Sequence, residues 1–269
     1  MAGSLAAPLT MEDIVIRECV TIDELDRCVH LQREVFGLPD LEISPRRHLI
    51  VSRQAGGWTL GAFVNERLVG FVHHLTAVRS DDEIFGYSHM MAVAADFQNK
   101  GVGAKLKWSQ RERALQEGRS FIKWTWDPMQ ARNAHFNLNR LGVTVSDYAA
   151  NFYGTDYPND PSLTNLEPAG IDSDRLFAKW QLKSPRVLKL AKASGDDANS
   201  AIKPEATIQI PPNWTKLSRE NPGVARQEQL RVRDEFLSAF AGGLVAGGFE
   251  RSPEQPRYLL YREEVLGLV

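Results

Sequence analysis

The sequence predicts an α/β fold in which strands and helices alternate along the chain. Three observations lead to this prediction: short runs alternate apolar and polar residues as half-buried strands do, helix-capping residues stand between several of these runs, and Asn65-Glu66 joins two β-rich runs as a tight turn would. The predicted order is strand, helix, hairpin, strand, helix, strand, helix, strand. With 43% apolar residues in a chain of 269, a substantial core can form.

The first elements have the clearest boundaries. Residues 14–19 alternate like a strand, after which Thr21 can cap a helix, with Glu24 completing a capping box. Gly37 is expected to end this helix. Residues 39–49 are typical of a loop or a short helix, and the hairpin follows within residues 59–78.

The later elements are predicted from the same signals. A strand at residues 83–93 precedes a glycine-containing segment, which opens a helix that runs to about Gly118. We expect the remaining elements as strands at 121–126, 143–154, 175–182 and 207–212, helices at 131–142 and 223–243, and a terminal hairpin at 244–263.

Composition divides the chain into four parts. Residues 1–11 are expected to be a flexible N-terminus, and residues 12–183 form the principal domain. A polar segment, 184–206, is expected to link this domain to an extension, 207–269, that packs on or beside it.

The charge balance argues against two classes of partner. Lysine and arginine number 32 against 34 aspartates and glutamates, a net charge of -2, so neither nucleic acid nor an anionic membrane is a predicted partner. No run of residues has the apolar length of a signal peptide or a membrane span. Cys19 and Cys28 are the only cysteines, which suits a reducing compartment, so we expect a cytoplasmic protein without a metal site.

Two glycines mark the start of the helix that follows the strand at residues 83–93. A dinucleotide-binding fingerprint requires a third glycine where Leu106 stands, and a P-loop requires four residues between its glycines, whereas one residue separates Gly101 from Gly103. The glycine segment fits an anion site, because N–H groups at a helix N-terminus attract a phosphate and glycines let the phosphate approach closely. Lys100 and Lys105 add positive charge alongside.

Residues 91–106, MAVAADFQNKGVGAKL, resemble the acyl-coenzyme A loop of the GNAT superfamily of N-acetyltransferases, which has the pattern Q/R-x-x-G-x-G/A after a strand. The element order is similar over about residues 14–154, and segments such as QREVFG and SHMMAV are similar to a subgroup of this length with a C-terminal extension. The resemblance implies the GNAT fold: a mixed, mostly antiparallel central sheet flanked by helices, with strands splayed at the acyl-CoA site, plus a C-terminal α/β extension. It also implies acetyl-CoA, or another acyl-CoA, as co-substrate.

The resemblance assigns the pantetheine arm to the end of the strand and the pyrophosphate to the loop. Asn133 and Asn137 lie four residues apart on the predicted helix, so they share a face that can bond the cofactor's amide groups, although a solvated polar face is an alternative. The predicted cofactor-binding residues are Met91, Ala92, Val93, Gln98, Asn99, Lys100, Gly101, Val102, Gly103, Ala104, Asn133 and Asn137.

Acyl transfer to an amine requires a group that takes the amine's proton. His89 lies four residues before Val93, where the arylalkylamine acetyltransferases of this family carry a histidine that relays this proton, and an imidazole pKa suits the task. The alternative is a strand histidine with a structural role. Tyr87 is expected on the same face as His89 and is a candidate for substrate contact. His73 and His74 must point to opposite faces of their strand and are held in reserve.

The family's usual proton donor to the departing thiolate is a helix tyrosine, and Leu138 occupies its position here. Tyr148 and Tyr153 are downstream alternatives, of which Tyr153 is the predicted catalytic residue, and solvent is a third option. Two further candidates for substrate contact are Trp126, which core packing would equally explain, and Asp127, which would equally cap the next helix. Arg46 and Arg47 can hold a substrate carboxylate or be a solvated basic pair.

The resulting prediction is an acyl-CoA-dependent N-acyltransferase. It would transfer an acetyl group, or alternatively a succinyl group, to a primary amine of a small molecule such as an amino acid. A non-catalytic acyl-CoA-binding module and a protein-lysine acetyltransferase are the alternatives. The C-terminal extension is expected to cover the site or to form a homodimer.

Overall fold

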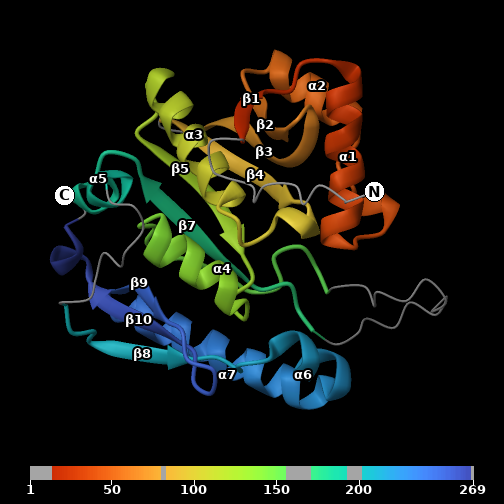
Figure 1. Cartoon of the computed structure of the whole chain (residues 1–269). Helices are drawn as coiled ribbons and strands as arrows, with labels where there is room; N and C mark the ends of the chain where they lie inside the picture. Colours follow the sequence, from red (N-terminus) through yellow and green to blue (C-terminus); the bar gives the residue numbers. More distant parts are fainter. Residues whose placement is uncertain (1–13, 80–82, 156–170, 193–201, 268–269) are drawn as a thin grey trace, which may run out of the picture. The chain divides into compact units, whose positions relative to one another are not determined.

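The computed structural model describes residues 14–79, 83–155, 171–192 and 202–267 (Figure 1). Contacts within the chain divide it into two compact units, Met1–Gly118 and Arg119–Val269. The boundary between them falls inside the segment 12–183, which the sequence predicts as one domain, so the predicted domain limits stay a prediction. Each unit combines strands with helices, and the predicted mostly antiparallel α/β arrangement is confirmed.

The first unit contains four strands in antiparallel order β1-β2-β3-β4. The predicted strand, helix, hairpin, strand and helix are all present. Its elements are β1 (Val15–Glu18), α1 (Ile22–Phe36), α2 (Arg46–Gln54), β2 (Trp58–Val64), β3 (Arg67–Val78), β4 (Ile84–Val93) and α3 (Val102–Gln116).

Local signals of the sequence set the ends of these elements. Thr21 and Glu24 form the predicted capping box at the start of α1, and Gly37 ends the helix in the left-handed conformation at φ 61°. Asn65 and Glu66 have φ values of 46° and 63°, the left-handed values that a two-residue hairpin turn of this hand requires.

Each face of the four strands buries a separate apolar cluster. Helices α1 and α2 cover one face, where Leu25 and Leu49 pack with Phe71 and Ala92. Helix α3 covers the other face, where Leu106 packs in a cluster with Ile14, Trp58, Leu60, Ala62, Val64, Val69, Val72 and Val102. Strand β4 therefore presents alternate side chains to two differently built surfaces.

The second unit contains two groups of strands. In one, β7 pairs antiparallel with both β5 and β6, and in the other β10 lies between β8 and β9. The elements are β5 (Phe121–Trp126), α4 (Ala131–His135), β6 (Tyr148–Ala149), β7 (Arg175–Gln181), α5 (Pro185–Lys192), β8 (Ala206–Gln209), α6 (Trp214–Glu220), α7 (Pro222–Ala241), β9 (Leu244–Glu250) and β10 (Arg257–Arg262).

Three expectations about the second unit are corrected. The predicted strand at 143–154 is reduced to β6 and two isolated bridges, because the backbone at Val145 pairs with β9 instead of continuing a strand. The predicted helix at 131–142 changes to a π-helical turn, Phe136–Arg140, after α4. Part of the predicted linker is helix α5, which buries Val187 and Leu190, while residues 193–201 lie outside the described residues.

Buried hydrogen bonds attach the C-terminal strands to the rest of the second unit. Arg186 donates to the carbonyl oxygens of Leu138, at 2.8 Å, and of Gly247 on β9. The Asn139 side chain makes two bonds to the backbone of Phe249, one donated at 3.1 Å and one accepted at 2.8 Å. The extension is therefore part of this unit's core.

We expect Asn139→Ala to destabilise the second unit by at least about 2 kcal/mol, since it leaves a buried N–H and a buried C=O of Phe249 without their partner. Urea-induced unfolding measures this loss. Asn133→Ala is the matched control, because Asn133 is exposed, and it should change stability by no more than about 0.5 kcal/mol. Equal losses in the two variants would contradict the role given to Asn139.

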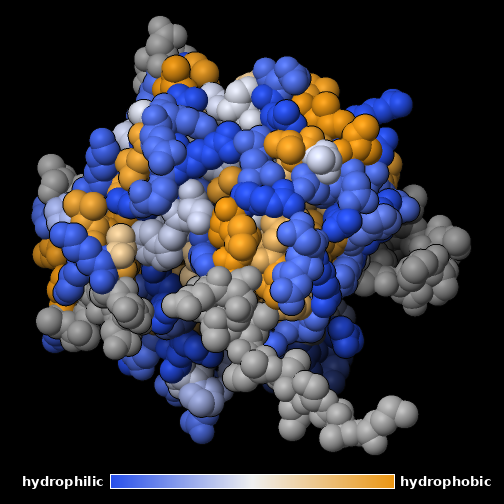
Figure 2. Space-filling view, turned by 45° about the horizontal axis from the view of Figure 1, so that its top comes forward, coloured by the Kyte–Doolittle hydropathy of each residue, from blue (hydrophilic) through white to orange (hydrophobic). Residues whose placement is uncertain are grey.

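The surface in Figure 2 is mostly hydrophilic, with hydrophobic residues in separate groups. Within the described ranges, no helix is both long enough and apolar enough to cross a membrane.

Candidate active site

The glycine loop connects β4 to α3 by a tight turn in which two residues adopt the left-handed backbone conformation. A 3-10 turn, Ala95–Phe97, follows the strand, and then Asn99 and Gly101 adopt φ values of 60° and 82°. Gly101 is the N-cap residue of α3 and requires glycine because a side chain would be strained at this φ. Gln98 fixes the start of the loop by donating from Nε2 to the carbonyl oxygen of Val93 at 3.1 Å.

The loop presents the N-terminus of α3 as an anion site. The first hydrogen bond of the helix runs from the Lys105 N–H to the Gly101 carbonyl at 3.0 Å, so the N–H groups of Val102, Gly103 and Ala104 precede the intrahelical ladder. The first turn contains no acidic residue. Helix geometry, charge and the missing Cβ at two positions therefore fit a pyrophosphate group.

The two lysines beside the loop differ in their contacts. Lys105 donates from Nζ to the carbonyl oxygen of Ile14 at 2.6 Å, so its side chain holds β1 and not the loop alone. Lys100 is exposed, with Nζ 5.5 Å from the ring centre of Phe97. Lys100 is therefore the lysine better placed for an anion.

The predicted pantetheine segment forms the last three residues of β4. Met91, Ala92 and Val93 pair with β3 along one edge. In an antiparallel pair alternate residues direct their N–H and C=O groups away from the partner strand. The segment therefore has backbone groups on the opposite edge, the edge that the resemblance assigns to the pantetheine arm.

A β-bulge lies at His89. His73 pairs with Met90 and His74 pairs with Ser88, so His89 is the extra residue of β4 and has no partner on β3. The sequence did not predict this bulge. Bulges redirect a side chain out of the regular ladder and are frequent next to active sites. His89 is exposed, which leaves its ring accessible to an acceptor.

His89 belongs to a cluster of three histidines, His48, His73 and His89, which we call the histidine cluster. The ring centre of His48 lies 5.5 Å from those of both other histidines, and His73 and His89 are 6.1 Å apart. Ser44 also reaches His89, with Oγ 3.3 Å from Nε2. Ser88 lies on the opposite face, in contact with Lys107 of α3, so Tyr87 and His89 share a face by alternation.

His48 was missed by sequence reasoning. It lies on α2, in a segment that the sequence describes only as a loop or a short helix. Two features of the sequence could have indicated a helix here: Pro45, which is typical of a helix start, and the apolar spacing of Leu49 and the residues after it. The Nε2 atom of His48 is buried, and no hydrogen-bond partner for it lies in the described part of the chain.

The surroundings of two members of the histidine cluster, His73 and His89, lower their pKa values. The pKa of His73 is lowered to about 3, chiefly by burial and then by the nearby His89 and His48, against a hydrogen bond at Trp58 that raises it. Removal of water lowers the pKa of His89 as well, and His48 contributes. A neutral His89 at physiological pH can accept a proton.

His74 points to the other face of β3, as predicted. It is fully buried and stacks on Trp58, with ring centres 4.1 Å apart. His73 is also fully buried, bonded to Thr59 Oγ1 at 2.8 Å and to Ser52 Oγ at 3.0 Å. Neither histidine is therefore accessible to a ligand.

The buried His73 predicts a pH dependence of stability. Its pKa is about 3 when folded and near 6.5 when unfolded, so between these values the unfolded chain binds more protons and stability falls as pH falls. Within this pH window the free energy of unfolding should fall by roughly 1.4 kcal/mol for each pH unit, and we expect His73→Gln to abolish this fall. Urea titrations at pH 7 and pH 5 measure it, with the exposed His30→Gln as control. The same pH dependence in all three proteins would contradict this assignment.

The second unit holds the two tyrosine candidates. Tyr148 is buried and donates to Asp174, and burial followed by this hydrogen bond raises the pKa of its phenol. Tyr153 is exposed, and its hydroxyl lies 3.4 Å from Thr125 Oγ1 on β5. Leu138, at the position of the family's tyrosine, is fully buried. Of the two tyrosines, Tyr153 is the one accessible to a ligand.

The contacts of Trp126 and Asp127 fit the alternatives to substrate contact, which are core packing for Trp126 and capping of the next helix for Asp127. Trp126 is 4% exposed and donates from Nε1 to the Tyr258 hydroxyl at 3.2 Å, so the unit's own core accounts for it. Asp127 accepts from the Met129 N–H at 2.8 Å and from Gln130 Nε2 at 3.2 Å, which stabilises the turn before α4.

The two predicted amide ligands have different surroundings. Asn133 on α4 is exposed, whereas Asn137, in the π-helical turn, is 5% exposed. The change from α to π geometry between them means that they do not form one uniform polar face. Their role in binding the cofactor stays a prediction.

The basic pair of the first unit lines a shallow pocket of about 510 Å³ between α1 and α2. Arg46 is paired with Asp26 at 2.6 Å, and Arg47 is exposed. Arg33 and Asp40, which also line this pocket, form a second ion pair at 2.6 Å. Arg47 is therefore the member of the pair better placed to hold a substrate carboxylate.

In the first unit, a glycine-capped helix N-terminus follows a bulged strand that carries an exposed histidine. Residues 25–142 match the model of the Acetyltransferase (GNAT) family. Domains of this family transfer acyl groups from acetyl-CoA. No curated protein sequence matches the chain.

Several solved structures are similar to the chain, all at low identity. The ribosomal-protein-S18-alanine N-acetyltransferase of Escherichia coli is 15% identical, with 63% of this chain and 94% of that chain covered and a TM-score of 0.48. A GNAT family acetyltransferase of Elizabethkingia anophelis, with acetyl-CoA bound, is 19% identical over 63% and 99% of the two chains, with a TM-score of 0.45. A putative GNAT acetyltransferase of Desulfovibrio desulfuricans is 14% identical over 63% and 99%, with a TM-score of 0.49.

Proposed function

We propose that the chain is an acyl-CoA-dependent N-acyltransferase that acts on a primary amine of a small molecule, with acetyl-CoA as donor and succinyl-CoA as the alternative. The observation that carries this proposal is the helix N-terminus at Gly101, where backbone N–H groups and an exposed Lys100 meet in a loop without bulky side chains.

The loop's own atoms would hold the donor. The N–H groups of Val102, Gly103 and Ala104 suit the pyrophosphate, and Gln98 keeps the loop against the end of β4. The outer edge of Met91–Val93 suits the amide groups of the arm. When bound, acyl-CoA supplies an acyl group activated as a thioester.

His89 would take the amine's proton. An alkylamine is mostly protonated at neutral pH and must be neutral to form the C–N bond. His89 is accessible, is directed out of the ladder by the bulge and has a lowered pKa, so its unprotonated nitrogen can accept this proton. Ser44 would orient the ring through Nε2.

The departing thiolate depends less on an acid catalyst than the amine depends on a base. A thiol has a pKa near 8.5, so its anion is a tolerable leaving group near neutral pH. Tyr153, exposed near the end of β5, or water would return a proton to the sulfur when the C–S bond breaks.

A non-catalytic acyl-CoA-binding module is the second candidate function. The observation that favours it is Leu138, which is buried where the family's catalytic tyrosine stands. Such a module would keep the anion site and lose the acid-base residues.

Thiol release from acetyl-CoA and from succinyl-CoA tests the proposal against a panel of amino acids, arylalkylamines and a lysine-containing peptide. We expect release that depends on a small amine and saturates with it. Thermal stabilisation by acyl-CoA without release for any amine would favour the binding module, release with the peptide alone would favour a protein-lysine acetyltransferase, and no stabilisation would refute the anion site.

A further inference from the structure

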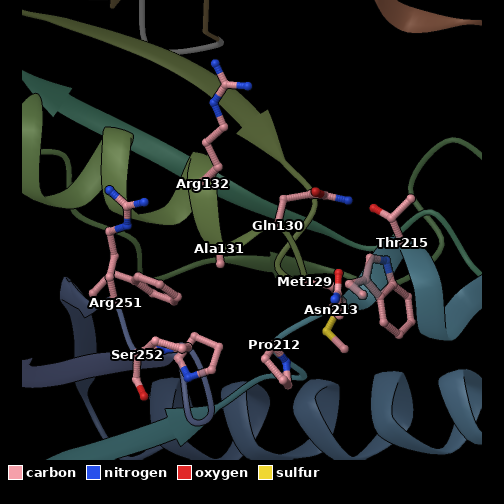
Figure 3. A pocket seen from close by; sticks show the side chains of 13 residues that line it. Met129, Gln130, Ala131, Arg132, Pro212, Asn213, Thr215, Arg251 and Ser252 are labelled. Carbon is pink, nitrogen blue, oxygen red and sulfur yellow. The ribbon is translucent and has the colours of Figure 1, made fainter. Parts of the chain in front are cut away.

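The second compact unit contains a cavity that neither the glycine loop nor the histidine cluster uses. Its volume is about 540 Å³, which is in the range of small-molecule sites. Three segments of this unit line it: the start of α4, the residues that lead into α6, and the loop between β9 and β10 (Figure 3). Two of the three belong to the C-terminal extension.

The inner part of the cavity is apolar. Met129 is 1% exposed and Phe249 is 2% exposed, so both are fixed in the core beneath it. Trp214 contributes a ring at the start of α6 that is 8% exposed. Burial of an apolar ligand body against such surfaces is favourable by the area removed from water.

The charges of the cavity have one sign. Among the described residues that line it, Arg132 and Arg251 are the charged ones and none is acidic. Figure 3 shows their side chains extending in the same direction, one from α4 and one from the loop after β9. Two guanidinium groups favour a carboxylate or a phosphate, to which arginine can bond through two N–H groups.

Arg251 differs from the neighbouring arginines of the extension. Arg257 pairs with Glu250 at 2.7 Å, and Arg231 and Arg262 are bonded to glutamates. Arg251 is exposed and makes no ion pair or hydrogen bond with the residues that the structure describes. No carboxylate of the described residues therefore neutralises its charge.

We propose that this cavity is a binding site for a small organic anion, with an oxyanion head at Arg251 and Arg132 and an apolar body against Met129, Trp214 and Phe249. The site is additional to the acyl-CoA loop, and its existence does not depend on the proposed transferase activity. It is linked to Asp127, a predicted substrate residue, since Met129 and Gln130 from its lining bond that carboxylate.

Titration calorimetry on the full chain tests the site with three probes of similar shape: phenylacetate, phenylphosphate and the uncharged phenylacetamide. We expect saturable binding of at least one anion and weaker binding of the amide. Arg251→Gln should lower the affinity for the anion at least about tenfold, since a charge-assisted hydrogen bond is lost. Arg219→Gln is the matched control, because Arg219 is exposed on α6 outside the cavity, and it should leave the affinity within about twofold.

Two further arms separate this site from the donor loop. Saturating coenzyme A and the variant Gly101→Ala should both leave the affinity for the anion unchanged. The tighter of the two anions would identify the head group as carboxylate or phosphate. Absence of saturable binding, equal losses in the two arginine variants, or displacement of the anion by coenzyme A would each overturn the proposal.

Discussion

Replacement of His89 by glutamine should lower kcat by about 10²–10⁴-fold, the range that a general base contributes. The physical reason is that His89 is the accessible member of the histidine cluster, and the bulge in β4 directs it out of the ladder. Glutamine keeps a polar side chain of similar size without a titratable nitrogen. Thiol release at saturating amine measures the effect, which should appear in kcat and leave acetyl-CoA binding within about twofold.

The pH profile distinguishes a base from a structural residue. Because the pKa of His89 is lowered, the acid limb of kcat/KM should lie below pH 6.5 in the wild type and be absent from the residual activity of His89→Gln. His30→Gln serves as the control, since His30 is exposed and lies outside the histidine cluster. If His89→Gln retained full activity or an unchanged acid limb, His89 would not be the base.

Substitution of Gly101 by alanine should weaken acetyl-CoA binding at least about tenfold. Gly101 has a φ of 82°, so a Cβ atom strains the N-cap of α3, the helix whose first N–H groups are proposed to hold the pyrophosphate. Loss of one charge-assisted bond to the phosphate is enough for this factor. Titration calorimetry with acetyl-CoA measures it directly.

Gly118 supplies a control with the same backbone strain. It follows α3 at a φ of 79°, and a Cβ atom there would meet nothing within 4 Å. Gly118→Ala should therefore lose a similar stability, about 1–2 kcal/mol, and retain donor affinity. Equal affinities in the two glycine variants would show that the donor does not approach the backbone at Gly101.

Local signals predicted much of the fold. The capping box of Thr21 and Glu24, the turn at Asn65 and Glu66 and the left-handed Gly37 depend on neighbours within a few residues, so one sequence suffices to find them. The same is true of the glycine loop, whose pattern lies within six residues, 98–103.

What was missed depends on distant partners. The bulge at His89 exists only through the register between β3 and β4, and His48 joins His89 only because α2 packs over the same face of the sheet. The buried roles of Trp126 and Arg186 likewise depend on Tyr258 and Gly247, far away in the sequence. No periodicity or spacing in a single sequence reports such pairs.

The most direct test of the proposed transferase is a single-turnover reaction with isotopically labelled acetyl-CoA and a saturating amine, in which free thiol and labelled amide are quantified in the same sample. We expect one amide formed for each thiol released, at a rate that His89→Gln lowers by about 10²–10⁴-fold. Thiol without amide, or bound donor that yields neither product with any amine, would contradict it.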